Sequence, residues 1–555
     1  MMTSIHAQGT EELRRRITSQ AASLGALTGW RRALCAFVSG VGCTLAMAPY
    51  YILPLLILGL CCLFLLLALP ADAARPNRAA FLTGWWFGFG YFLSGLYWMG
   101  FAFLVRAAEF AWMIPIAIPA FAGFLALFFA LPALCLVAVA RPTWTPGARL
   151  LLFAGLISVL EYARGHILTG LPWNLLGQSM LIHPALAQTA SLYGVYGLSL
   201  VVSLLALLPV MDLHPSRRLP WGVMACGLGF AALAVTGAVR LSQADRLADD
   251  QHIRLSVIQP NIPQKDKSDP SKRRDNFDQL LQLSARAQQE QRASGEKPSD
   301  EPLRHLMIWP ENAVPWVGEQ PGVLREIGLA VGEKTVVFAG SLRRSYDEDG
   351  AAQFYNTIAV ISPQAGDGLA SVAAYYDKHH LVPFGEYLPL KGVLTALGLS
   401  QLAPVQDGFT PGTGPVTLDM AGVKIAPLIC YEAIFPGALY PRGDRPDLLI
   451  TSTNDAWFGD NAGPKQHLDQ ARLRAIEGGV PMARAANTGI SAVIDSVGRV
   501  RQHAPLYAPG TLVSALPART ARPFYDRVGD GVWAVMAVLV MGAGLVMGRS
   551  AARHP

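Results

Sequence analysis

Long apolar runs occupy most of the first 240 residues and return once near the C-terminal end. A run of about 20 apolar residues is long enough to cross a bilayer as a helix. The pattern therefore predicts about eight membrane spans, of which the fifth is the shortest, at 33–49, 51–69, 80–104, 111–139, 149–163, 188–211, 219–239 and 531–548.

Arginines mark every second loop between these runs, and all of these loops fall on the same side as the N-terminus. Under the positive-inside rule that side is cytoplasmic. Residues 1–32 are polar and basic, and no small-residue cleavage pattern follows the first run, so a cytoplasmic leader is predicted instead of a signal peptide. The loop arginines are Arg75, Arg78, Arg141, Arg149, Arg217, Arg218, Arg549 and Arg553.

The large polar region that follows alternates β-branched runs with amphipathic stretches, which predicts a layered α/β fold with a buried sheet. Two helices are expected, at 272–291 and 465–477. The predicted organisation is a leader (1–32), a transmembrane bundle (33–239), an extracytoplasmic domain (240–525), and a final span with a cytoplasmic tail (526–555). The predicted strands are 253–259, 305–309, 335–340, 356–362, 423–430, 447–452 and 490–495.

Composition agrees with an integral membrane protein carrying a globular domain, because 52% of residues are hydrophobic and only 15% are charged. The net charge of +6 sits in short clusters between apolar runs, so it indicates topology and not nucleic-acid binding. Of seven cysteines, six lie in apolar runs and Cys430 stands alone in the polar region. Since Cys430 has no nearby soluble partner, a disulfide framework is excluded and a reactive thiol is favoured over a small core residue.

Three polar segments of the soluble region carry candidate chemistry, each after a predicted strand. They are Trp309–Asn312 with Glu311, Asp377–Tyr387 with Lys378, and Ile429–Glu432 with Cys430. Taken singly, the acid and the cation are more often solvated surface groups. The adjacent His379 and His380 lack the spacing of a metal site, so no metal and no cofactor are predicted.

Two motifs stand out within the apolar region. Gly84–Tyr91 mixes small and aromatic residues at helical spacing, which favours helix packing over a functional role. Glu161 and Arg164 precede Gly170–Asn174 near a span end. Ionisable groups at that depth line a cavity or pair with each other, although an interfacial anchor is the favoured interpretation.

The order Glu311, Lys378, Cys430 and its local contexts resemble the nitrilase superfamily, whose Glu, Lys and Cys arise in that order from three strand ends. With the N-terminal spans and the final span added, the whole chain resembles the apolipoprotein N-acyltransferase family of the bacterial inner membrane. The resemblance implies an α-β-β-α sandwich in the periplasm. It also implies supporting roles for Glu386, Tyr431 and Glu432. Residues 454–458, which include Asp455, are implied to form part of the active-site rim, with Asn454, Trp457 and Phe458 as supporting or substrate-binding residues.

That family transfers an acyl chain from a phospholipid, typically phosphatidylethanolamine, to the α-amino group of a diacylglyceryl cysteine of an apolipoprotein. The residue types fit this chemistry, because a lysine ammonium favours the thiolate form of a cysteine and a glutamate can take the proton that the thiol loses. The resemblance implies membrane lipid as a partner and a monomer without nucleic acid. Two alternatives remain open: a membrane-tethered amidase that transfers to water, and a transporter in which the spans are the functional part.

Two further expectations concern access to the site. Asn261–Gln264 matches the family's early motif, but Ser268 stands where the family has a tryptophan nearby, so an aromatic contact is absent or supplied elsewhere, for example by Trp316. The apolar stretch Gly392–Gln401 is either a mobile arm that touches the bilayer and gates the cleft, or an ordinary core helix.

Overall fold

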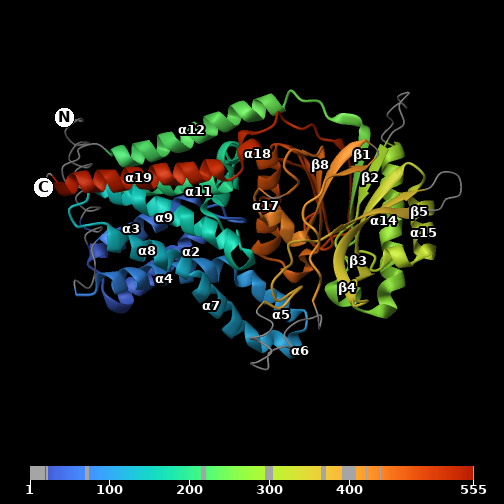
Figure 1. The fold of residues 1–555 in the computed structure, drawn as a ribbon, viewed down its shortest axis with the longest axis horizontal. Coiled ribbons are helices and arrows are strands. Elements are labelled where there is room, and N and C mark those ends of the chain that lie inside the picture. Colours follow the sequence, from blue (N-terminus) through green and yellow to red (C-terminus); the bar gives the residue numbers. More distant parts are fainter. Residues whose placement is uncertain are drawn as a thin grey trace, which may run out of the picture. The chain divides into compact units, whose positions relative to one another are not determined.

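The computed structural model describes residues 19, 23–68, 74–213, 220–293, 304–363, 370–389, 408–420, 422–437 and 439–553. They form two compact units, one comprising Met1–Leu241 with Arg527–Pro555 and the other Ser242–Asp526 (Figure 1). The stretch 392–401 and nearly all of the leader up to residue 22 lie outside the described residues. The expectations for them therefore stay predictions.

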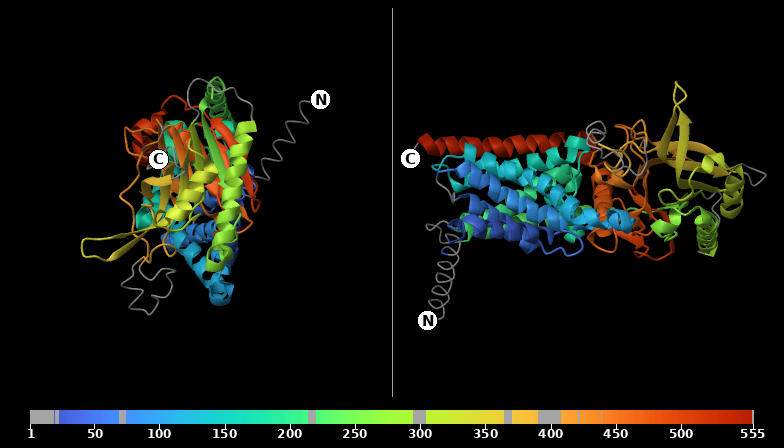
Figure 2. Two further views of the ribbon diagram at one scale, coloured as in Figure 1. Left: turned by 90° about the vertical axis from the view of Figure 1, so that its right-hand side faces the viewer. Right: turned by 90° about the horizontal axis from the view of Figure 1, so that it is seen from below.

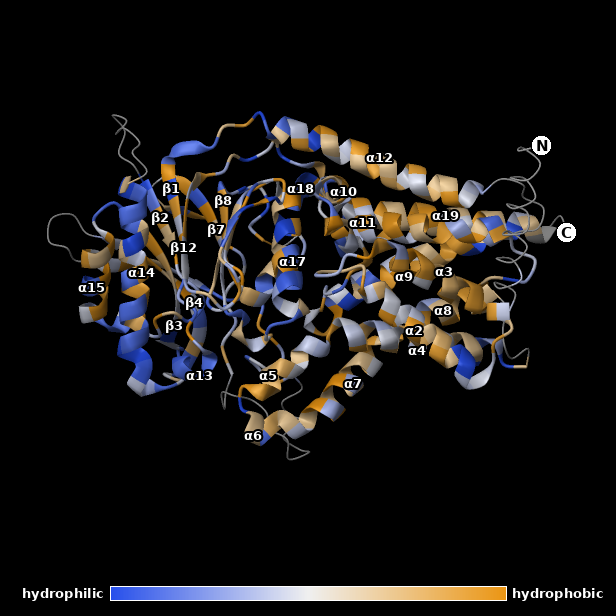
Figure 3. Cartoon of the chain, turned by 180° about the vertical axis from the view of Figure 1, so that it is seen from behind, coloured by the Kyte–Doolittle hydropathy of each residue, from blue (hydrophilic) through white to orange (hydrophobic). Residues whose placement is uncertain are grey.

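The first unit is helical, and its long helices run in roughly the same direction (Figure 2). Hydrophobic residues cover most of their length (Figure 3). In the described residues, five helical stretches are long and apolar enough to cross a membrane, and a pair bent by 56° would make a sixth. The five are Ala107–Val139, Pro146–Thr169, Ala190–Leu213, Trp221–Ala244 and Gly531–Ala551, and the bent pair is Pro76–Gly95 with Tyr97–Leu104.

Every apolar run predicted as a span falls on helix. The helices α2 and α3 are only 16 residues each, so the number of spans stays a prediction. The helix over the fifth run is longer than the predicted 149–163, since it begins at Pro146 and ends at His166. The helices of this part are α2 (Gly29–Thr44), α3 (Leu53–Ala68), α4 (Pro76–Gly95), α5 (Phe101–Leu104), α6 (Ala107–Phe110), α7 (Ile114–Leu125), α8 (Leu127–Val139), α9 (Pro146–His166), α10 (Pro184–Ala187), α11 (Ala190–Leu207), α12 (Trp221–Ala244), α18 (Phe524–Val528) and α19 (Gly531–Arg553).

Glycines of α4 allow two helices to approach backbone to backbone. A Cβ on Gly84 would lie 2.5 Å from the carbonyl oxygen of Phe129 in α8, and one on Gly88 would lie 2.8 Å from Cα of Ala126, the residue that precedes α8. Small residues at such positions let helices pack closely in the absence of a hydrophobic driving force. The packing interpretation of Gly84–Tyr91 is therefore confirmed.

The ionisable pair Glu161 and Arg164 is buried in the helical unit and binds main chain. Arg164 Nη1 donates to the carbonyl oxygens of Leu171 and Trp173, both at 2.6 Å. Glu161 Oε1 accepts from the amide of Leu176 at 2.9 Å. Both side chains thus provide hydrogen-bond partners for main-chain groups of the segment that follows α9, which would otherwise lack them.

The second unit contains two six-stranded sheets. The first has the strand order β12-β1-β2-β3-β4-β5 and the second β11-β10-β9-β8-β7-β6. Within each, the central strands are parallel: β1 with β2 and β3, and β7 with β8 and β9. The strands are β1 (Asp250–Gln259), β2 (Arg304–Ile308), β3 (Thr335–Tyr346), β4 (Ala352–Pro363), β5 (Ala370–Asp377), β6 (Leu418–Met420), β7 (Val423–Ile429), β8 (Leu448–Thr453), β9 (Met482–Ala486), β10 (Ala492–Ile494), β11 (Val500–His503) and β12 (Gly510–Leu516).

The two sheets pack face to face, with helices on their outer faces (Figure 1). One apolar core joins inner-face residues of both sheets, such as Val257 and Ile450. A second core lies between the first sheet and the helices α14 (Arg273–Ala293) and α15 (Pro321–Val331). A third lies between the other sheet and α17 (Ala462–Gly478). These layers form an α-β-β-α sandwich.

The sequence located both predicted helices and the seven predicted strands, although β3 continues six residues beyond the predicted end, to Tyr346. It missed β5, β6, β9, β11, β12 and α15. β5 is an edge strand in which only Tyr376 is buried, and β9 consists of Met, Ala and Arg with no β-branched residue. Neither pattern resembles a buried β-branched run, so a sequence search based on such runs passes over them.

Candidate active site

Three strand ends bring the candidate groups together. Glu311 follows β2 by three residues, and Lys378 and Cys430 come directly after β5 and β7. Lys378 Nζ lies 3.8 Å from Glu311 Oε1, and both charges act on the Cys430 thiol. The structure therefore assembles the three residues that the sequence singled out.

Lys378 is held by more than one acid. Its Nζ lies 2.8 Å from Glu386 Oε2, and its side chain is 1% exposed. Asn356, on β4, bridges the two carboxylates, because its Nδ2 donates to Glu311 Oε1 and to Glu386 Oε1, each at 2.7 Å. The amide of Val382 also donates to Glu386. The lysine is thus fixed between two acids that share a neutral hydrogen-bond donor.

The electrostatics of this cluster suit a buried acid and base. Burial raises the pKa of the Glu311 carboxyl, Lys378 opposes this shift and Glu386 adds to it. Burial alone would lower the pKa of Lys378, but Glu386 and Glu311 more than offset it, so the net shift is upward. Lys378 is therefore a permanent cation, and Glu311 is a carboxylate with a heightened tendency to take a proton.

Cys430 sits at a sharp turn between β7 and a 3₁₀ helix that spans Cys430–Ile434. Its φ of 49° is rare for a residue with a Cβ, and such strain clusters at functional positions. Burial raises the pKa of its thiol to about 12, with Glu311 adding to the shift and Lys378 opposing it. The resting group is a thiol that needs a base.

Glu432 connects the turn at Cys430 to the segment that carries Lys378. Its carboxylate accepts from the main-chain amides of Ile429 (2.7 Å), His379 (2.8 Å) and His380 (3.2 Å), and from the Tyr376 hydroxyl (2.9 Å). The His379 ring lies 2.7 Å away. Burial would raise the pKa of Glu432, but these partners, His379 first, lower it below its usual value.

The other residues implied by the resemblance differ in their surroundings. Tyr431 packs edge-on against the rings of His380 and Phe435. Asn454 is buried, and its Nδ2 donates to Gln264 Oε1 at 2.7 Å. Of the remaining two, Trp457 is exposed, whereas the ring of Phe458 packs against His467.

A buried cluster beside Cys430 joins Asp455, a member of the implied rim segment 454–458, to Arg484 and His467, which were not predicted from the sequence. Asp455 Oδ2 accepts from Arg484 at 2.7 Å, and its Oδ1 lies 2.9 Å from His467 Nδ1. His467 Nε2 lies 3.2 Å from the carbonyl oxygen of Cys430. Burial would raise the pKa of Asp455, but Arg484 and His467 lower it to about 2. Arg484 and His467 come from different elements, so no local motif identifies them.

Lys267 was also not predicted. Its Nζ donates to the carbonyl oxygen of Glu311 at 2.7 Å, and its charge acts on the Glu311 carboxylate. Its neighbour Ser268 is exposed and bonds to the Gln264 carbonyl. The ring of Trp316, proposed as a substitute aromatic, packs 6.0 Å from that of Phe354.

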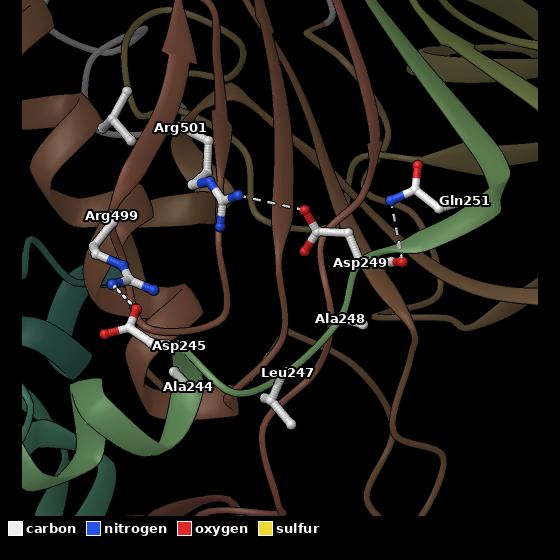
Figure 4. Close-up of a pocket in the computed structure, with 9 residues that line it drawn as sticks. Ala244, Asp245, Leu247, Ala248, Asp249, Gln251, Arg499 and Arg501 are labelled. Atoms are coloured by element: carbon white, nitrogen blue, oxygen red, sulfur yellow. Dashed lines mark hydrogen bonds and ion pairs between the residues drawn. The ribbon is translucent and has the colours of Figure 1, made fainter. Parts of the chain in front are cut away.

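A separate pocket of about 670 Å³ lies between residues 244–251 and the start of β11 (Figure 4). Its charged groups are paired: Arg499 with Asp245 at 2.5 Å and Arg501 with Asp249 at 3.4 Å. None of the candidate catalytic residues lines it. These two ion pairs tether the segment that leads into β1.

Comparison with known proteins covers both units. Residues 39–208 match the family model of the apolipoprotein N-acyltransferase N-terminal domain, and residues 254–525 match that of carbon-nitrogen hydrolases. The chain is 40% identical over 522 residues to an apolipoprotein N-acyltransferase of Rhodopseudomonas palustris, covering 92% of this chain and 94% of the relative. It is 40% identical over 541 residues to one of Bradyrhizobium diazoefficiens, covering 95% and 97%. A solved carbon-nitrogen hydrolase from Helicobacter pylori G27 is 16% identical with a TM-score of 0.34, covering 48% of this chain and 89% of that one.

Proposed function

The chain belongs to the apolipoprotein N-acyltransferase family, and we propose that it acylates apolipoproteins through a thioester on Cys430. It is an acyltransferase of the carbon-nitrogen hydrolase superfamily. The acyl donor is a phospholipid, with phosphatidylethanolamine as the expected one. The acceptor is the α-amino group of the diacylglyceryl cysteine at the N-terminus of an apolipoprotein.

The convergence of Glu311, Lys378 and Cys430 is the observation that carries this proposal. In the first half-reaction Glu311 takes the proton of the Cys430 thiol, and the sulfur attacks the carbonyl carbon of the donor ester. Lys378 stabilises the resulting oxyanion, together with the main-chain N–H that follows Cys430. The ester C–O bond then breaks, and Glu311 returns the proton to the leaving alkoxide, which departs as lysophospholipid.

The second half-reaction repeats these roles with an amine. The neutral α-amino group attacks the thioester carbon and passes a proton to Glu311. Collapse of the intermediate forms the amide and expels the Cys430 thiolate, which recovers the proton from Glu311. Because burial raises the pKa of the resting thiol to about 12, the first half-reaction depends on this base. The second depends on Glu311 to accept the amine proton and to return it to the Cys430 thiolate.

The remaining groups position these three. Glu386 and Asn356 fix Lys378 and Glu311, and Glu432 fixes the turn of Cys430 to the Lys378 segment. Asn454, Tyr431, Trp457 and Phe458 are proposed to support the site or contact substrate. Acidic groups on both sides of Lys378 keep it charged, which is the form that an oxyanion needs.

We place residues 240–525 in the periplasm and the eight spans in the bacterial inner membrane, with the basic loops in the cytoplasm. Both substrates are anchored in lipid. A catalytic domain tethered by spans at both ends keeps the thioester at the bilayer surface, where confinement raises the effective concentration of the acceptor. We expect the enzyme to work as a monomer.

The test is to incubate the purified enzyme with phospholipid alone and to examine it by mass spectrometry. The expected product is an acyl group on the peptide that contains Cys430, removed by neutral hydroxylamine and absent from Cys430→Ala. Adding a diacylglyceryl lipopeptide should discharge it to the amine. Steady release of free fatty acid without an adduct would instead favour an amidase-like hydrolase, which the carbon-nitrogen hydrolase match makes the second candidate.

A further inference from the structure

Lys267 is a cation at the catalytic centre for which the proposed mechanism has no use. It ends the four-residue helix α13 (Gln264–Lys267), and its Nζ donates to the carbonyl oxygen of Glu311 at 2.7 Å. Its neighbour on the same helix, Lys265, is exposed. Two lysines two residues apart thus have different surroundings, and one of them touches the residue proposed as the base.

The main chain around Glu311 has little freedom. The next residue, Asn312, has a φ of 49°. On the other side, a Cβ added to Gly340 would lie 2.2 Å from the Pro310 carbonyl and 2.6 Å from Cα of Glu311. Lys267 fixes the carbonyl of this tightly packed turn, so its hydrogen bond contributes to the direction in which the Glu311 side chain leaves the chain.

Charge gives Lys267 a second effect. The groups that act on the Glu311 carboxylate are Lys378, Glu386, the Asn356 amide, Lys267 and the Cys430 thiol. Lys378 is itself shared with Glu386, at 2.8 Å against 3.8 Å for Glu311. Lys267 is therefore a second cation beside Glu311, and its positive charge offsets the part of the carboxylate charge that Lys378 alone does not neutralise.

We propose that Lys267 is a positioning residue that holds the main chain of Glu311 and keeps its carboxylate ionised until it takes the proton of the Cys430 thiol. This inference rests on the proposed role of Glu311 as the base. A nearby positive charge favours the ionised carboxylate, so loss of that charge makes Glu311 protonate at a higher pH. A protonated Glu311 cannot accept the Cys430 proton, so the rate of thioester formation should fall on the acid side of the pH profile as Glu311 becomes protonated.

The size of the effect depends on pH. Burial lowers the pKa of Lys267 to about 8, against the attraction of Glu311. Below that value Lys267 is charged and supports the base. Above it Lys267 is neutral, so its replacement by an uncharged residue no longer removes a charge.

The experiment measures the rate of thioester formation on Cys430 from phospholipid between pH 5 and pH 9, in the full-length enzyme. The acid limb is the pH range in which the rate falls as Glu311 becomes protonated. Lys267→Met and Lys267→Gln should move this limb upward by about half to one pH unit. Above pH 8 the pH-dependent part of the deficit should disappear, and only a constant loss from the missing hydrogen bond to the Glu311 carbonyl should remain. Lys267→Arg keeps the charge and should leave the limb in place, and Lys265→Met is the matched control on the same helix.

The outcomes separate this inference from the proposed function. An unmoved acid limb in Lys267→Met and Lys267→Gln, or an equal shift in Lys265→Met, overturns the role of Lys267. So does a loss of rate that is the same at every pH, which marks a purely structural contribution. If the unmodified enzyme forms no thioester, or if Glu311→Gln keeps its profile, the proposed function itself fails.

Discussion

Asn356→Leu tests how the two acids of the site share one lysine. Leucine is similar in size to asparagine but cannot donate the hydrogen bonds that Asn356 makes to Glu311 and Glu386, each 2.7 Å long. A hydrogen bond to a charged group contributes about 1.5–3 kcal/mol. Only the bond to Glu311 bears directly on proton transfer, so we expect acyl transfer to fall about 10- to 100-fold.

The pH dependence gives this prediction a second readout. The bond from Asn356 favours the ionised form of Glu311 and so lowers its pKa against the larger effect of burial. Without that bond the pKa of Glu311 rises, and the acid limb of the rate should move to higher pH. The deficit should therefore shrink in alkaline solution, where the carboxylate is ionised in both proteins.

The assay follows transfer from a phospholipid to a synthetic diacylglyceryl lipopeptide, with the triacylated product measured by mass spectrometry. Gln353→Leu is the control, because Gln353 lies on the same strand and its side chain accepts from the Tyr355 hydroxyl. A rate for Asn356→Leu within threefold of the unmodified enzyme, with an unmoved acid limb, would refute the proposed coupling of the two carboxylates.

Two further predictions address stability and topology. Glu432→Gln replaces a fully buried acceptor of several donors, so it should lower the melting temperature and the transfer rate. Because folding lowers the pKa of Glu432, its stabilisation is complete above the unfolded value of about 4.3 and is lost as the pH falls through the lowered value. The difference in melting temperature should therefore narrow in acid, and a constant difference would argue against the ionised form. A reporter fused after Arg218 should indicate cytoplasm and one inserted at 292–302 periplasm, whereas both on one side would contradict the eight-span prediction.

Much of the fold followed from local patterns. Long apolar runs all became helices, because a segment without polar side chains must satisfy its main chain internally. The predicted β-branched runs became strands of two sheets whose central strands are parallel. The edge strand β5 was missed, although it leads directly to Lys378, because an edge strand buries too few side chains to leave a periodic pattern.

The candidate triad was visible because each member lies in a short and distinctive context. Glu311 and Cys430 also follow predicted strands, whereas the strand before Lys378 was missed. Chain order and neighbouring residues were enough to select Glu311, Lys378 and Cys430 from a polar region with many other charges. The family resemblance also implied supporting roles for Glu386 and Glu432, since both lie within the matching motifs.

Tertiary structure alone decided which further groups act on the triad. Asn356 comes from the middle of a strand, Lys267 from a short helix far earlier in the chain, and His467 from α17. Their side chains reach the site only when two sheets and the helix behind them pack together. Hydrogen bonds and pKa shifts depend on distances between atoms remote in sequence, so the local context that singled out Cys430 does not reveal the groups that position it.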